Sequence, residues 1–156
     1  MATPDSKSTE VLFYHLERQT LEQILPGLLE RTLERGWRAV VQAGSEERLA
    51  AIDAHLWTFK DESFLAHGTV KEGFAADQPI LLTLDEANPN DAAVRFLVDG
   101  ARLTDFKSYL RVVLIFDGQD SAALDTARAQ WKAAKAQGCA ATYWQQTDAG
   151  RWEKRA

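Results

Sequence analysis

The chain has 156 residues, of which 46% are hydrophobic, 26% are charged and only Cys139 is a cysteine. This composition is typical of one globular domain. It excludes a disulfide framework and a cysteine-based zinc cluster, and the absence of an apolar run of about 20 residues excludes a membrane span. The polar N-terminus has no signal-peptide core, so we expect a cytoplasmic protein, and the net charge of −5 argues against nucleic-acid binding over the whole surface.

The first third of the chain predicts alternating strands and helices. Residues 1–9 are expected to be a disordered lead-in, and residues 11–14 form a short apolar run that is typical of a buried strand. Leucine and isoleucine at helical spacing then predict a helix that begins after Thr20, a good N-cap residue. A strand is expected over residues 37–43, and a second helix begins at Ser45. Short connections between strands and helices indicate a parallel sheet.

The rest of the chain continues this alternation after an irregular segment. Residues 58–78 have no clear periodicity and predict a long loop. Further strands are predicted at residues 79–84, 93–98, 110–116 and 140–144. Asp120 or Ser121 begins a third helix, which Gly138 ends. We therefore expect a single α/β domain over residues 10–147 with a polar tail at 148–156. Its three layers would be a mostly parallel sheet with helices on both faces, as in Rossmann-like nucleotide-binding folds.

The motifs that usually bring chemistry to such a fold are missing. The turn after the first strand, residues 14–20, contains no glycine, and no P-loop sequence occurs, so a bound nucleotide is not expected. His15, His55 and His67 do not share metal-ligand spacing. Cys139 is interpreted as a small buried residue. The sequence thus predicts no catalytic residue, no metal and no cofactor, although a site assembled from distant residues stays open.

Large aromatic side chains gather at the end of the second helix and in the predicted loop. They are Trp57, Phe59 and Phe64. Aromatic side chains in a loop need cover, either from the protein's own core or from a partner protein. Both interpretations stay open.

Charge is distributed unevenly along the chain. Residues 1–120 carry 12 basic and 20 acidic residues, a net charge of −8, whereas residues 121–156 carry 6 basic and 3 acidic residues, a net charge of +3. This difference predicts a basic patch that would suit an acidic peptide or a phosphate backbone. The alternative is a solvated helix face whose charges are balanced by neighbours.

The third predicted helix carries part of this basic charge. Leu124 and Trp131 belong to its apolar stripe, and Arg128, Lys132 and Lys135 form an adjacent basic stripe. An aromatic ring beside cations suits a peptide that ends in an apolar side chain and a carboxylate. An amphipathic helix with solvated lysines would have the same pattern.

Two motifs stand at the aromatic segment and at the basic helix. The first is an L-D-x-x-L-W-like helix end at residues 52–57, followed by E-S-F-x-x-H at residues 62–67. The second is A-R-x-x-W-K at residues 127–132, followed by Gly138. In this order they resemble the chi subunit family of bacterial DNA polymerase III. The similarity extends to residues 13–14 and 105–116 and covers most of residues 11–144.

The resemblance implies a non-catalytic accessory subunit of a DNA-directed DNA polymerase complex. Such a subunit links the clamp loader, through the psi subunit, to single-stranded DNA-binding protein, whose acidic tail ends in an apolar residue and a free carboxylate. Contact with DNA would be indirect, and no membrane is involved. The implied tail-binding residues are Leu124, Arg128, Trp131, Lys132 and Lys135. The implied contacts to psi, or to another clamp-loader or helicase partner, are Trp57, Phe59, Phe64 and His67.

Two departures from the family pattern bear on these expectations. Leu124 stands where the family often has a basic residue, which predicts a weaker or differently shaped tail site. Leu65 and Ala66 replace the usual proline before the histidine. Two other functions remain as alternatives: a small α/β enzyme or nucleotide-binding protein with an unrecognised site, and a nucleic-acid binder that uses the C-terminal basic residues.

Overall fold

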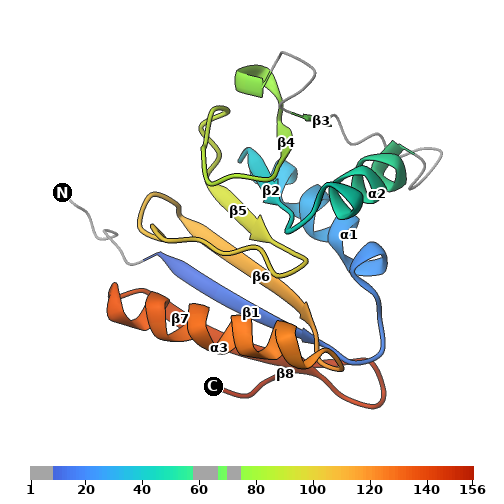
Figure 1. Ribbon diagram of the computed structural model, residues 1–156, viewed down its shortest axis with the longest axis vertical. Helices are drawn as coiled ribbons and strands as arrows, with labels where there is room; N and C mark the ends of the chain where they lie inside the picture. The colour runs from blue at the N-terminus through green and yellow to red at the C-terminus, as the bar shows by residue number, and fades with distance from the viewer. Residues whose placement is uncertain (1–8, 58–66, 70–74) are drawn as a thin grey trace.

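The computed structural model describes residues 9–57, 67–69 and 75–156 (Figure 1). The helices are α1 (Leu21–Glu34), α2 (Glu46–Trp57) and α3 (Ser121–Ala136), and a short 3-10 helix spans Ala75–Asp77. The strands are β1 (Glu10–Leu16), β2 (Ala39–Gln42), β3 (His67–Thr69), β4 (Ile80–Thr83), β5 (Val94–Leu97), β6 (Arg111–Asp117), β7 (Ala140–Gln146) and β8 (Trp152–Lys154). Among the described helices, none is long and apolar enough to cross a bilayer.

The strands form one sheet in the order β3-β4-β2-β5-β6-β1-β7-β8. The pairings from β3 to β7 are parallel, and β8 pairs antiparallel with β7. The segment containing α1 connects β1 to β2, and the segment containing α3 connects β6 to β7 in the opposite direction along the sheet. Parallel crossovers of one hand that run in opposite directions place their helices on opposite faces. The predicted three-layer α/β fold is confirmed.

The two faces of the sheet bury separate apolar clusters. On one face Leu25, Leu29 and Ile52, from α1 and α2, pack against the strands. On the other face Ala127 and Ala134 bring α3 close to β1 and β6, and Figure 1 shows α3 running along this side. Strands that are covered on both faces need continuous apolar runs, which explains why β2 and β4 are buried along their whole length.

The helix ends follow from local sequence. The Thr20 side chain accepts from the Gln23 N–H, and the Gln23 side chain accepts from the Thr20 N–H, so a capping box begins α1. Asp120 caps α3 by accepting from the N–H groups of Ala122 and Ala123. Gly138 has a φ of 81° directly after α3, a backbone conformation that favours glycine. These helix boundaries agree with those predicted from the sequence.

Three parts of the chain differ from the sequence-based expectations. Residues 67–69, expected in a loop, form β3, because the edge of β4 offers them parallel pairing. Residues 152–154, expected in a polar tail, form β8, because the Trp152 ring packs at 5.0 Å from the Tyr14 ring. Thr9, expected in a disordered lead-in, is buried and donates to the Tyr109 carbonyl at 2.6 Å.

Candidate interaction site

The position of α3 on the sheet is fixed by small and polar side chains. Ala127 and Ala134 are buried and allow the helix to approach the strands closely. The Gln130 side chain accepts from the Leu103 N–H at 2.9 Å and donates to the Leu103 carbonyl at 3.3 Å. Because one face of α3 is fixed in this way, the adjacent edge is presented toward β7 in one orientation.

Trp131 lies at that edge and is only partly buried. Its ring meets the Phe13 ring edge-on at a centroid distance of 5.2 Å and lies 6.2 Å from the Tyr143 ring. The Lys135 ammonium lies over the outer part of this cluster, 5.6 Å from the centre of the Trp131 ring. Trp131 therefore closes the core and also provides an aromatic surface beside a cation.

Arg128 is an exposed cation at this edge. Its side chain is 73% exposed, and its ion pair with Asp125, at 3.3 Å, lies between two solvated groups and contributes little. Burial raises the pKa of Tyr143, and the positive charge of Arg128 opposes this shift. Arg128 is therefore close enough to the Tyr143 phenol for its charge to act there.

The remaining predicted residues of this site fall into two groups. Leu124 is partly buried and packs against the core, so it contributes apolar surface at the edge. Lys132 is exposed, and within the described residues it makes no ion pair. We call the group Leu124, Arg128, Trp131, Lys132, Lys135 and Tyr143 the α3 edge.

Tyr143 was not predicted from the sequence as a site residue. Its hydroxyl lies 2.7 Å from His15 Nδ1, and His15 Nε2 lies 2.7 Å from a Glu17 carboxylate oxygen. This chain of polar contacts fixes the Tyr143 ring beside Trp131. The alternation of side chains along β7 could have indicated Tyr143, because every second residue of a strand that lies next to a helix points toward that helix.

The α3 edge has the chemistry to hold a carboxylate beside an apolar group. A guanidinium binds a carboxylate through two parallel hydrogen bonds, and the pairing is stronger than that of neutral groups. The rings of Trp131 and Tyr143 provide the adjacent apolar surface. The structure thus brings five predicted residues to one edge of α3.

The second predicted surface is described only in part. Trp57 is the last residue of α2, and its side chain, Phe59 and Phe64 lie outside the described residues. His67 begins β3, its side chain is 0% exposed, and its Nε2 lies 3.0 Å from Asp53 Oδ1. His67 therefore connects β3 to α2 inside the protein and does not present its ring to solvent.

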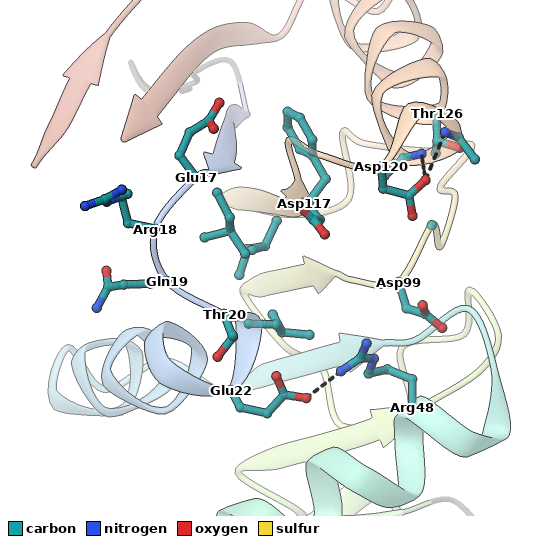
Figure 2. A pocket seen from close by; sticks show the side chains of 17 residues that line it. Glu17, Arg18, Gln19, Thr20, Glu22, Arg48, Asp99, Asp117, Asp120 and Thr126 are labelled. Atoms are coloured by element: carbon teal, nitrogen blue, oxygen red, sulfur yellow. Dashed lines mark hydrogen bonds and ion pairs between the residues drawn. The ribbon is translucent and has the colours of Figure 1, made fainter. Parts of the chain in front are cut away.

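A large hollow lies elsewhere, at the carboxyl ends of β1 and β6. It has a volume of about 530 Å³, and the first turns of α1 and α3 border it (Figure 2). In open α/β sheets this is the usual place for a ligand. Its charged lining is mainly acidic and consists of Glu17, Glu22, Asp99, Asp117 and Asp120, with Arg18 and Arg48. An acidic lining disfavours a phosphate.

The polar groups of this crevice are already bonded within the protein. Figure 2 shows Glu22 and Arg48 facing each other as an ion pair. The Asp99 carboxylate accepts from the Ser45 hydroxyl at 2.8 Å, and the Asp117 carboxylate accepts from the Gln119 N–H at 2.8 Å. Such groups stabilise turns and helix starts, and a ligand would have to displace these bonds.

Gln146 occupies the backbone N–H groups of the turn after β1. The Gln146 side-chain oxygen accepts from the N–H groups of Glu17, Arg18 and Gln19 at 3.1, 2.9 and 3.2 Å. In a nucleotide-binding protein, N–H groups in this turn bind phosphate. Here a buried side chain, 3% exposed, satisfies them. Sequence analysis found the missing glycines and missed Gln146, because its partners lie about 127 residues away.

Comparison with known proteins identifies a family that covers most of the chain. The family described as DNA polymerase III chi subunit, HolC, matches residues 8–142. The protein named probable DNA polymerase III subunit chi from Rickettsia prowazekii (strain Madrid E) is 26% identical over 102 residues, which are 64% of this chain and 62% of that protein. The aligned part therefore spans less than two thirds of this relative's length. The family match covers most of the chain, and the chain belongs to the DNA polymerase III chi subunit family.

Proposed function

We propose that this chain links the clamp loader of the DNA polymerase III holoenzyme to single-stranded DNA-binding protein during replication in the cytoplasm. In this proposal the α3 edge holds the acidic C-terminal tail of that protein. The chain itself contributes no catalytic group and contacts DNA only indirectly.

The observation that carries the proposal is the arrangement at the α3 edge. Arg128 is exposed and weakly paired, and its neighbours Trp131 and Tyr143 provide an aromatic surface fixed by core contacts. A tail that ends in an apolar residue and a free carboxylate fits this order of groups. Lys132 and Lys135 add positive charge for the acidic residues that precede the end of the tail.

A second contact, to psi or to another clamp-loader or helicase partner, is proposed at the Trp57 end of α2, with Phe59 and Phe64. In the sheet order, β3 next to α2 lies at one end, and β7 next to α3 lies near the other end. Partners at these two ends would not compete for space, which is what a linking subunit requires. His67 would act here indirectly, by fixing β3 against α2.

The tail proposal is tested by calorimetric titration with a peptide that ends in Asp-Asp-Ile-Pro-Phe. We expect a dissociation constant on the order of micromolar. Arg128→Ala should weaken binding about tenfold or more, and amidation of the peptide's terminal carboxylate should do the same, because each change removes one partner of the same charged pair. Arg102→Ala is the matched control, since Arg102 is an exposed arginine outside the α3 edge and does not line the hollow described above.

Two results would contradict the tail site: no binding of the peptide, or binding that Arg128→Ala leaves unchanged. Tight binding of bare single-stranded DNA by the isolated chain would instead favour the nucleic-acid alternative. Trp57→Ala should leave peptide binding unchanged and should weaken capture of the clamp-loader partner. That pair of results separates the two proposed surfaces.

A further inference from the structure

A groove lies between α1 and the β1-β7-β8 end of the sheet, on the face opposite α3. It has a volume of about 360 Å³. Its apolar lining consists of Tyr14, Ile24, Leu28, Trp144 and Trp152. These side chains are partly exposed, so the groove presents apolar surface to solvent. The family match ends at residue 142, so both tryptophans lie beyond it.

The aromatic floor of the groove is fixed by contacts within the protein. The Trp152 ring lies 5.0 Å from the Tyr14 ring, and the Trp144 indole N–H donates to the Thr142 hydroxyl at 3.0 Å. In the sheet, Tyr14 lies opposite Trp144, and Gln146 lies opposite Trp152. Trp144 and Gln146 are two residues apart on β7, so the side chains of both pairs point to the same face of the sheet. A partner would therefore meet a preformed surface.

Gly27 keeps the groove open from the side of α1. It lies inside the helix, where glycine is among the least favourable residues. A side-chain carbon built at Gly27 would meet no atom within 4 Å, so packing within the described structure does not require a glycine here. Because Gly27 lines the groove, its missing side chain adds directly to the space available for a ligand.

The groove carries positive charge on a protein of net charge −5. A neighbouring hollow of about 190 Å³ shares Tyr14, Leu28 and Arg31 with it and is also lined by Arg35 and Arg111. Among the described residues that line the two hollows there is no aspartate or glutamate. Arg31 is exposed and makes no ion pair in the described part of the chain, whereas Arg111 pairs with Glu10.

We propose that this groove docks a segment of a partner protein in which aromatic or large aliphatic side chains lie next to carboxylates. The apolar side chain would enter the space above Tyr14, Trp144 and Trp152. A neighbouring carboxylate would pair with Arg31, at the boundary of the two hollows. The groove combines positive charge with an apolar hollow that a glycine keeps open. It therefore favours a segment that carries carboxylates over a purely apolar segment. The site is separate from the α3 edge and does not depend on the tail proposal.

The test uses the full chain and a matched pair of end-blocked peptides, acetyl-Gly-Asp-Phe-Asp-Leu-Gly-amide and its counterpart with Asn for both Asp. The indole N–H signals of Trp144 and Trp152 are followed by NMR during titration. We expect saturable movement of both signals with the Asp peptide and binding at least about fivefold weaker with the Asn peptide. Arg31→Ala should weaken binding of the Asp peptide by a similar factor.

Gly27→Leu should abolish the movement of both signals, because Gly27 lines the groove and a leucine side chain there would occupy it. The first carbon of that side chain would meet no atom within 4 Å. Arg102→Ala is the matched control, since Arg102 is exposed and lines neither hollow, and it should bind as the unchanged chain does. If Gly27→Leu does not fold, Arg31→Ala and the peptide pair still decide the question.

The proposal would be overturned by any of three results. The first is no movement of the two indole signals at a peptide concentration of about 5 mM, which corresponds to weaker association than a specific site provides. The second is equal binding of the Asp and Asn peptides. The third is movement of the Trp131 signal in place of Trp144 and Trp152, with loss of binding in Arg128→Ala. That result would assign the peptide to the α3 edge.

Discussion

The crevice at the carboxyl ends of β1 and β6 and the edge of α3 differ in how their polar groups are used. The crevice is a large hollow bordered by two helix N-termini, yet several of its carboxylates and N–H groups already bond to other groups of the protein. The residues of the α3 edge line none of the three hollows described above, but Arg128 and Lys132 are exposed. Within the part of the chain that the structure describes, Arg128 makes one weak ion pair. The proposed tail site therefore depends on exposed, weakly paired charge and not on a hollow.

This difference has a physical basis in the hydrogen bonds that a ligand would have to replace. A ligand that enters the crevice must replace hydrogen bonds that the protein already makes, so its net gain is small. A carboxylate that approaches Arg128 competes only with water and with the weak ion pair to Asp125. The same fold position that binds nucleotides in other α/β proteins thus has a structural role here.

The largest expected effect comes from Gln146→Leu beside the crevice. This change removes the acceptor of three N–H groups in the turn between β1 and α1, and we expect the free energy of unfolding to fall by about 3 kcal/mol. Urea denaturation followed by circular dichroism measures it. A fall in the free energy of unfolding of less than about 0.5 kcal/mol would mean that water satisfies these N–H groups equally well. The hydrogen bonds to Gln146 would then not be what stabilises this turn.

Trp131→Ala should produce the next largest change in stability. Trp131 packs against Phe13 and Tyr143 but is only partly buried, so we expect a loss of about 2 kcal/mol. Trp131→Phe retains most of the packing and serves as the control. If Trp131→Ala weakened tail-peptide binding but left the unfolding free energy unchanged, the ring would belong to the site and not to the core.

Salt should affect the α3 edge more than the crevice. Raising the salt concentration from about 50 to 500 mM should weaken tail-peptide binding about threefold to tenfold, because the charges concerned are exposed and screened. The stability difference between Gln146→Leu and the unchanged chain should vary little with salt, since the contacts of Gln146 are between uncharged groups. Binding that does not respond to salt would indicate an apolar contact and contradict the proposed role of Arg128.

Arg128→Ala should leave the free energy of unfolding within about 0.5 kcal/mol of its original value, because an exposed ion pair contributes little. The same variant should reduce tail binding strongly, as proposed above. A destabilisation as large as that of Gln146→Leu would show that Arg128 is structural and would remove the contrast between the two regions.

The smallest expected effect is a change in the titration of Tyr143. Burial raises the pKa of Tyr143 above 10.0, and the charge of Arg128 opposes this shift. Arg128→Ala should therefore raise the pKa of Tyr143 further, which NMR of labelled tyrosine detects. Above pH 10 the unfolded chain loses the Tyr143 proton while the folded chain still keeps it. The free energy of unfolding should therefore be maintained below pH 10 and fall above it. Tyr143→Phe should reduce that fall, and an unchanged titration in Arg128→Ala would separate Arg128 from Tyr143.

Local sequence was sufficient for much of the fold. Helical spacing of leucines, Thr20 and Asp120 as caps, and Gly138 at a positive φ predicted α1 and α3 within a few residues. The strands β2, β4 and β6 were found because strands buried on both faces need apolar runs. Short strands at the edges, β3 and β8, were missed because their pairing depends on the neighbouring strand and not on their own composition.

The sequence by itself determined the α/β class, the caps of the helices and the stripe that places Arg128, Trp131 and Lys135 on one side of α3. These properties depend on contacts within a few residues. Only the tertiary structure decided that Tyr143 joins this stripe and that Gln146 fills the turn after β1. The tertiary structure also decided that the His67 side chain is buried. Each of these contacts joins segments far apart in the chain, where the spacing of residues carries no information about distance.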